Sequence, residues 1–318
     1  MKLKQILVLT MAIVTILASA GIASAAKSYV SIATGGTSGT YFPIGGAIAQ
    51  AVSKAGVIQA TAETGNASVA NINLIAKGDI EVAMVQNDIT FWAFKGEQMF
   101  KAPLPNVRTI CALYPEHVQL IISKDSGIKT LADLKGKRVG VGAPGSGTEG
   151  DAKAILGVAG IQYADMKVDF LDFGATTSRF KDNQIDAGFV VAGYPTASVM
   201  DLALTKDISL LNFEDKTLAD LSKAHPYLVA STIPGKTYKG VDNAVKTPAV
   251  MAILVTHDKM ADDVIYNFTK AMFENIADIH AAHAKGKEIN LATALDGLTA
   301  PLHPGAAKFF KEKGMAMK

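Results

Sequence analysis

Residues 35–42 read Gly-Gly-Thr-Ser-Gly-Thr-Tyr-Phe and directly follow a short strand-like run, Tyr29–Thr34. A second loop of the same kind, Gly140-Val-Gly-Ala-Pro-Gly-Ser-Gly-Thr-Glu149, follows another strand-like run, and each loop continues into a helix-like segment. Such a loop offers unhindered backbone N–H groups, small hydroxyls and the positive end of a helix dipole. Two such loops predict that a small anion is held between two lobes, which favours a receptor over an enzyme.

The N-terminus has the pattern of a secretion signal. Lys2 and Lys4 form a basic start, residues 6–17 are apolar apart from Thr, and Ala23-Ser24-Ala25 is a small-residue cleavage site. We expect residues 1–25 to be a signal peptide that is cleaved near Ala25, and the mature chain to be periplasmic. The apolar run is short for a membrane anchor, which needs about 20 residues.

Charge and cysteine content exclude several classes of function. The formal net charge is +2, and removal of residues 1–25 deletes two lysines and no acids, so the mature chain has a net charge of 0. No basic patch is visible, and we therefore expect no nucleic-acid partner. Cys111 is the one cysteine, lies in an apolar run, and is expected to be a buried small hydrophobic residue.

Strand and helix signals alternate along the chain, which predicts an α/β fold. After the first loop we expect a helix over 44–55, a strand over 57–62, a helix over 68–77 and a strand over 81–85. After the second loop we expect a helix near 150–156, a strand over 168–173 and a short helix over 176–181. Residues 183–191 are expected to be a helix end and an acid followed by a small-residue strand. Beyond them we expect a strand over 245–256 and one helix from 261 to about 283. Residues 284–318 are expected to form short helices and polar loops.

The order of these segments suggests two similar lobes. A strand over 117–123 lies between the two halves, and the strand near 245 leads back to the first half. We expect residues 26–118 plus 246–318 to form lobe I, and residues 119–245 to form lobe II, with two crossing strands as the hinge.

Four short segments resemble one known family. They are Gly35-Gly-Thr-Ser-Gly-Thr-Tyr41, Glu63-Thr-Gly-Asn-Ala-Ser68, Leu131-Ala-Asp-Leu-Lys-Gly-Lys137 and Gly142-Ala-Pro-Gly-Ser-Gly-Thr-Glu149. Together with Tyr114-Pro-Glu-His117 and Gly193-Tyr-Pro195, they are similar to the extracytoplasmic receptors of TRAP transporters, in the TAXI subgroup.

The resemblance implies a two-lobed periplasmic-binding-protein fold (Venus flytrap, type II). It also implies a small organic anion as ligand, such as glutamate, 2-oxoglutarate or a related dicarboxylate, and TRAP membrane permease subunits as partners. We expect a monomer with no cofactor, no metal and no catalytic residue. Because none of the arginines lies in a glycine-rich loop, recognition by hydroxyls and backbone N–H groups is expected.

The candidate ligand-binding residues lie in the loops and at strand ends. In each loop the alternative is a tight turn with a helix cap, which also favours Gly, Ser and Thr. Strand ends and helix starts line the crevice of open α/β sheets, which adds polar residues after the strands. An aromatic side chain next to the hinge either covers the ligand or is a core residue. The candidates are Thr37, Ser38, Gly39, Thr40, Tyr41, Ser68, Asn71, Gln86, Asn87, Tyr114, Ser146, Gly147, Thr148, Glu149, Tyr194 and Pro195.

Glu149 has two interpretations. It is either a first-turn acid that complements its helix dipole, or a carboxylate that accepts hydrogen bonds from the ammonium group of an amino-acid ligand. For the chain as a whole, two other functions stay open: an exported α/β enzyme that acts on a small carboxylate, and a solute receptor that serves a sensor or another transporter.

Overall fold

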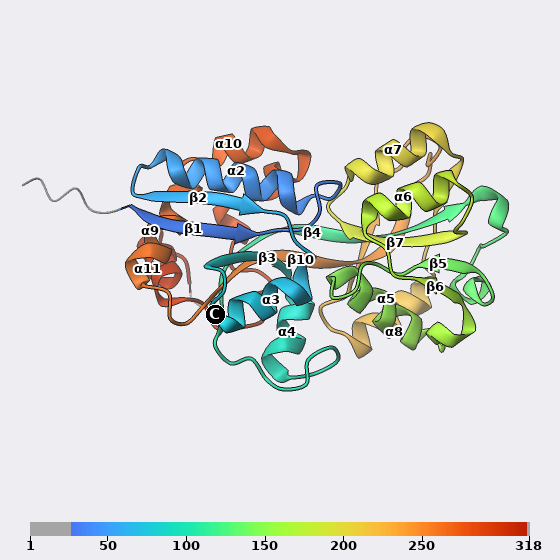
Figure 1. The fold of residues 1–318 in the computed structure, drawn as a ribbon, viewed down its shortest axis with the longest axis horizontal. Helices are drawn as coiled ribbons and strands as arrows, with labels where there is room; N and C mark the ends of the chain where they lie inside the picture. The colour runs from blue at the N-terminus through green and yellow to red at the C-terminus, as the bar shows by residue number, and fades with distance from the viewer. Residues whose placement is uncertain (1–26, 317–318) are drawn as a thin grey trace, which may run out of the picture.

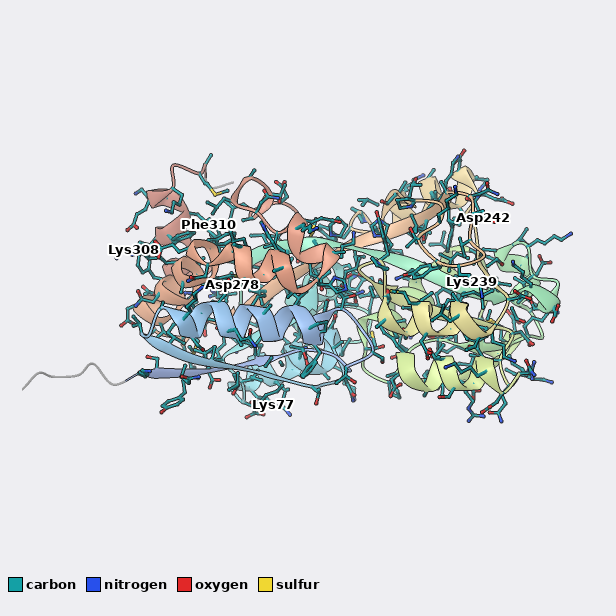
Figure 2. All side chains as sticks on the ribbon, turned by 90° about the horizontal axis from the view of Figure 1, so that it is seen from above. Lys77, Lys239, Asp242, Asp278, Lys308 and Phe310 are labelled. Atoms are coloured by element: carbon teal, nitrogen blue, oxygen red, sulfur yellow. The ribbon has the colours of Figure 1, made fainter. Side chains whose placement is uncertain are left out.

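The computed structural model describes residues 27–316, which form a mixed α/β structure. Ten strands form one sheet: eight follow the order β2-β1-β3-β10-β4-β7-β5-β6, while β8 pairs with β4 and β9 with β10 off this path. Figure 1 shows two groups of elements, joined where β4 and β10 pass between them. Turned by 90°, Figure 2 shows the groups lying end to end, with Lys77 labelled in one and Lys239 in the other. We call these groups lobe I and lobe II.

Lobe I begins with three parallel strands and the helices that follow them. β1 (Ser28–Ala33) pairs with β2 (Ile58–Glu63) and with β3 (Val82–Gln86), so that the carboxyl ends of the three strands meet at one edge. The helices α2 (Tyr41–Lys54), α3 (Ser68–Lys77) and α4 (Asn87–Lys95) each begin at that edge. The loops between strand and helix therefore gather on the side that faces lobe II.

Two long strands connect the lobes. β4 (Val107–Ser123) pairs with β10 (Val245–His257) through residues 107–117, and then with β7 through residues 117–122. β10 pairs with β3 at its carboxyl-terminal half and with β9 (Val229–Ile233) at its start. The predicted lobe boundary near residue 118 falls inside β4, and the one near 245 at the start of β10. We retain these boundaries as a proposal.

Lobe II repeats the arrangement of parallel strands with helices between them. β5 (Arg138–Gly140) pairs with β6 (Lys167–Asp169) and with β7 (Ala187–Ala192). The helices α5 (Gly147–Val158), α6 (Phe173–Lys181) and α7 (Ala197–Thr205) follow these strands in the same way as α2 to α4 follow theirs in lobe I. β8 (Ile208–Leu210) and α8 (Asp215–Ala224) lead to β9.

The C-terminal segment returns to lobe I. α9 (Asp262–Glu274), α10 (Ile276–Ala282) and α11 (Pro304–Glu312) lie beside α2 and β1 in Figure 1. Phe273, Phe309 and Phe310 form a ring cluster between α9 and α11, and they belong to the apolar core that α2 shares with β1. Cys111 is fully buried in the same core, as its apolar surroundings predict.

Several expected elements differ from the observed ones. α2 begins at Tyr41 rather than 44, and α4, which Asn87-Asp88 opens, was not among the expected helices. The expected strand over 168–173 ends at Asp169, because Asp172 caps α6 through its carboxylate and Phe173 is already helical. The single helix expected over 261–283 breaks at Asn275, whose side chain donates to the carbonyl of Ala271.

The predicted signal peptide, residues 1–25, lies outside the described residues. Within residues 27–316, no helix combines the length and the apolar character that a membrane span requires.

Candidate ligand-binding site

A cavity of about 380 Å³ lies between the two lobes, at the edge where the strand-to-helix loops meet. Its lobe I wall comes from the loop after β1, the loop after β2, the end of β3 and the middle of β4. Its lobe II wall comes from the loop after β5, the start of α6 and the end of β7. Several lining side chains carry hydroxyl, amide or carboxyl groups. Among the residues that the structure describes, no lysine or arginine lines the cavity.

Four helices begin at the cavity. α2 and α3 present their first residues from lobe I, and α5 and α6 present theirs from lobe II. The first N–H groups of a helix lack partners within the helix, and the helix dipole places partial positive charge there. An anion or a strong hydrogen-bond acceptor therefore finds a favourable potential without a charged lysine or arginine in the wall.

The second glycine-rich loop is shaped by one glycine and one cap. Gly142 has φ of 97°, and a Cβ there would lie 2.8 Å from the backbone N of Glu149, so this turn requires glycine. Ser146 is the N-cap of α5, and its hydroxyl accepts from the Glu149 N–H at 3.1 Å. This bond satisfies one early N–H of α5, whereas the N–H groups of Gly147 and Thr148, ahead of it, have no acceptor within the helix.

The first glycine-rich loop is joined to lobe II by two hydrogen bonds. The Thr40 hydroxyl donates to the carbonyl of Gly193 at 2.9 Å, and the Ser198 N–H donates to the carbonyl of Ser38 at 3.2 Å. Thr40 is the N-cap position of α2, yet its side chain makes no capping bond. Its hydroxyl therefore serves the contact between the lobes rather than the helix.

Two further bonds cross between the lobes on the other side of the cavity. The Ala70 N–H donates to the carbonyl of Gly145 at 3.0 Å, and Gln86 Nε2 donates to Asp151 Oδ2 at 2.8 Å. Gly147 fits so closely against lobe I that a Cβ there would overlap Gln86 Oε1. The structure thus describes the lobes in contact around the cavity.

Glu116 is the carboxyl group at the back of the cavity. It is 2% exposed, and Tyr41 donates its hydroxyl to Glu116 Oε2 at 2.8 Å. Burial raises the pKa of Glu116 to about 8, the bond from Tyr41 opposes that rise, and Asp88 adds to it. At neutral pH a protonated Glu116 can donate a hydrogen bond to a ligand oxygen.

A buried cation lies beside the crossing strands. Lys285, 1% exposed, places its Nζ 2.8 Å from Glu288 Oε1 and 3.9 Å from the centre of the Tyr194 ring. The Tyr194 ring in turn meets the His117 ring edge-on at 4.6 Å. Burial, helped by Lys285, lowers the pKa of His117 to about 3, so His117 is neutral at neutral pH.

Nine of the predicted ligand-binding residues lie together in the cavity wall. They come from both lobes, and the two glycine-rich loops that supply most of them are more than 100 residues apart in the sequence. Their contact with a ligand stays a prediction. The nine are Ser38, Gly39, Thr40, Tyr41, Ser68, Gln86, Ser146, Gly147 and Thr148.

The other seven predicted residues are outside the cavity wall. Thr37 is exposed in the turn before α2. Asn71 donates to the carbonyls of Thr34 and Met84, both at 2.9 Å, and so ties β1 to β3. Asn87 donates to the carbonyl of Gly297 and accepts from the Met251 N–H.

The aromatic candidates near the hinge are packed in the protein interior or against it. Tyr114 is fully buried in the lobe I core, which favours the core interpretation of this residue. Tyr194 and Pro195, joined by a cis peptide bond, follow β7, and the Tyr194 ring contacts His117 and Lys285 instead of the cavity.

Glu149 turns toward its own loop. Its Oε2 accepts from the Gly145 N–H at 3.3 Å, and its backbone N–H binds the Ser146 hydroxyl. This geometry favours the first-turn interpretation over a contact with a ligand ammonium group.

The structure adds cavity residues that the list of candidates lacks. Thr64, Gly65, Asn66 and Ala67 follow β2, in a segment that had been quoted only for its resemblance to a family. Glu116 had been quoted only within the segment Tyr114–His117 that resembles the family. Lobe II adds four more residues, Asp172, Phe173, Val191 and Ala192. The first two were missed because the expected strand over 168–173 included the start of α6.

The fold is that of the two-lobed, mixed α/β periplasmic binding proteins. A solved structure from Bordetella bronchiseptica aligns with 91% of this chain and 99% of its own, with a TM-score of 0.59 and 18% identity. The binding-protein component of a phosphonate ABC transporter from Pseudomonas aeruginosa aligns over 90% of this chain and 95% of its own, with a TM-score of 0.51 and 12% identity. These likenesses establish the fold class.

The chain belongs to the NMT1-like family, whose model matches residues 32–314. Curated relatives from Brucella abortus and Brucella suis, provisionally named binding proteins, are each 26% identical over 234 residues. That match covers 70% of this chain and 65% of each relative's length.

Proposed function

We propose that this protein is an extracytoplasmic solute receptor, which captures a small organic anion between its lobes and delivers it to a membrane permease. The observation that carries the proposal is the cavity at which four helices begin, two from each lobe. Hydrogen bonds to a charged group are worth about 1.5–3 kcal/mol each, and they strengthen when closure excludes water. Capture of this kind requires no covalent chemistry.

The proposed ligand is a carboxylate such as glutamate, 2-oxoglutarate or a related dicarboxylate. Its anionic group would lie between the first turns of α3 and α5, near the Ser68 hydroxyl and the N–H groups of Gly147 and Thr148. A second polar end would reach Glu116 and Tyr41. The cavity of about 380 Å³ suits a ligand of this size better than a large cofactor.

The proposed partner is the permease of a TRAP transporter, and the proposed location is the periplasm. Support comes from the segments that resemble TAXI receptors, two of which, after β1 and after β5, form opposite walls of the cavity. A permease would recognise the surface that the two closed lobes form together. We further propose that the receptor acts as a monomer.

The test is a thermal-shift screen of the mature protein against glutamate, 2-oxoglutarate, succinate and methylphosphonate. A ligand at about 100 times its dissociation constant adds about 2.7 kcal/mol to the stability of the folded state. A carboxylate that raises the melting temperature, and that also makes the protein more compact in small-angle X-ray scattering, supports the proposal. A shift with turnover of the compound would instead indicate an enzyme, and native mass spectrometry identifies any ligand retained from purification.

A further inference from the structure

Two buried aspartates meet where the lobes touch. Asp88 is the second residue of α4 in lobe I, and Asp151 lies in the second turn of α5 in lobe II. They are 1% and 0% exposed, and neither lines the cavity. Their contact therefore depends on how the lobes are arranged rather than on the ligand directly.

The hydrogen bonds around the pair are incomplete without an additional proton. Asp151 Oδ2 accepts from Gln86 Nε2 at 2.8 Å, but Asp151 Oδ1 and both carboxyl oxygens of Asp88 have no donor among the described residues. Each carboxyl group is close enough to the other to shift its pKa. Their sequence neighbours also pack together, since a Cβ on Gly150 would lie 2.9 Å from Ile89 Cδ1. Since ionised carboxylates only accept hydrogen bonds, a proton on one of the two groups would supply a donor that these oxygens lack.

The surroundings favour that proton. Burial is the main cause that raises the pKa of both Asp88 and Asp151, and Glu116 on β4 raises that of Asp151 further. From α8, His225 lies against Trp92 of α4, and burial lowers its pKa. The charged side chains on the packed helices and strands point to solvent or are bonded elsewhere: Lys77 on α3, Glu149 and Lys153 on α5, Lys216, Asp220 and Lys223 on α8, and Lys246 on β10.

The position of each group indicates which one holds the proton. Asp88 is in the first turn of α4, where the helix dipole favours the ionised form. Asp151 already accepts from Gln86 through one oxygen, which leaves its other oxygen to donate to Asp88.

We propose that Asp151 and Asp88 form a proton-sharing pair that exists only while the lobes are closed, so that closure around the ligand takes up one proton. This inference rests on the proposed receptor function. In an open form, α4 and α5 separate, and both carboxyl groups reach water and ionise with pKa values of about 4. Closure must then take up a proton from solution at any pH between that value and the raised pKa of the closed pair.

The consequence is a ligand affinity that falls as pH rises. When one proton is taken up on binding, the dissociation constant rises about tenfold for each unit of pH increase, between the open-state pKa and the raised closed-state pKa. Glu116 contributes in the same direction, because its pKa is also raised. The contribution of the pair must therefore be measured with Glu116 left unchanged in both the variant and the wild type.

The test counts protons with Asp151→Asn, which places a permanent N–H donor where the proposed proton lies. With 2-oxoglutarate as probe, calorimetry at pH 7 in two buffers of different ionisation enthalpy gives the proton uptake on binding. We expect uptake to fall by about one proton in Asp151→Asn. We also expect the slope of log Kd against pH to be smaller by about one in this variant than in wild type. Asp88→Asn should act likewise, and Glu97→Gln, an exposed acid just beyond α4, should match wild type.

The outcomes separate this inference from the proposed function. If 2-oxoglutarate binds and proton uptake is equal in wild type and Asp151→Asn, the proton-sharing pair is refuted and the receptor stands. If 2-oxoglutarate does not bind, scattering of the ligand-free protein decides. A wild type that expands between pH 5 and 8, beside an Asp151→Asn protein that stays compact, supports the pair and counts against the ligand class. Identical profiles of the two proteins refute the pair.

Discussion

Gly147→Ala should prevent full closure of the lobes without harming the fold of either one. The three atoms nearest to a Cβ at this position all belong to lobe I: two atoms of the Gln86 amide and, at 2.8 Å, the Ser68 hydroxyl. Gly147 is the first residue of α5 and has no positive φ, so alanine suits its backbone and should stabilise the chain by about 0.4–1 kcal/mol. The steric clash between the new Cβ and lobe I therefore arises only when the two lobes are in contact.

The expected loss of ligand affinity follows from the displacement of the Gln86 side chain that the new Cβ requires. Overpacking costs about 1–3 kcal/mol, and displacement of Gln86 breaks its bond to Asp151, which is worth about 1 kcal/mol. A loss of about 2–4 kcal/mol in the closed state weakens ligand binding by about 30-fold to several hundred-fold. The affinity for the best ligand of the thermal-shift screen, measured by calorimetry, tests this value.

The matched control is Gly157→Ala in the same helix. A Cβ at Gly157 meets nothing within 4 Å, and the residue is exposed. This variant should bind ligand as wild type does and compact normally in scattering. If Gly147→Ala binds as tightly as Gly157→Ala, the cavity does not depend on the close approach of α5 to Gln86, and the reasoning is wrong.

Three further predictions concern the cavity wall. Because the pKa of Glu116 is raised from 4.5 to about 8, wild-type stability should decrease by about 1.4 kcal/mol for each pH unit across that window, and Glu116→Gln should remove this decrease. Melts of the two proteins at pH 5 and 8, each saturated with ligand so that the lobes stay closed around Glu116, should show a difference that grows with pH; a constant difference contradicts the burial argument. Thr40→Val should weaken ligand binding by about 2- to 13-fold through loss of the bond to Gly193, while Thr40→Ser retains it. Ser146→Ala should cost about 1 kcal/mol in urea denaturation, because α5 loses its cap, and Ser146→Asn should restore most of that loss.

Local sequence patterns predicted much of the cavity wall, because the wall is built from local structures. A glycine-rich loop followed by a helix is defined by a few adjacent residues, and both loops indeed open helices at the cavity. The helix over 68–77 was predicted with its observed bounds, since Ser68 begins it and Gly78, with φ of 78°, ends it. Local patterns failed where two of them compete, as at Asp172, whose role as a helix cap ended the expected strand early.

Glu149 shows the limit of such patterns. From its sequence position, Glu149 could either complement the start of its helix or accept hydrogen bonds from a ligand ammonium group. The choice depended on where the Gly145 N–H points, which is fixed by the turn at Gly142.

The sequence by itself determined the α/β class, the two loops and the hydroxyls and amides that they carry, because these depend on backbone preferences of neighbouring residues. Only the tertiary structure decided that Glu116 lies behind the cavity, that Lys285 is buried against Tyr194, and that Asp88 meets Asp151. Each of these relations joins side chains from distant parts of the chain. Their charge states depend on burial, and burial is a property of the folded lobes and of their contact, which no short segment encodes.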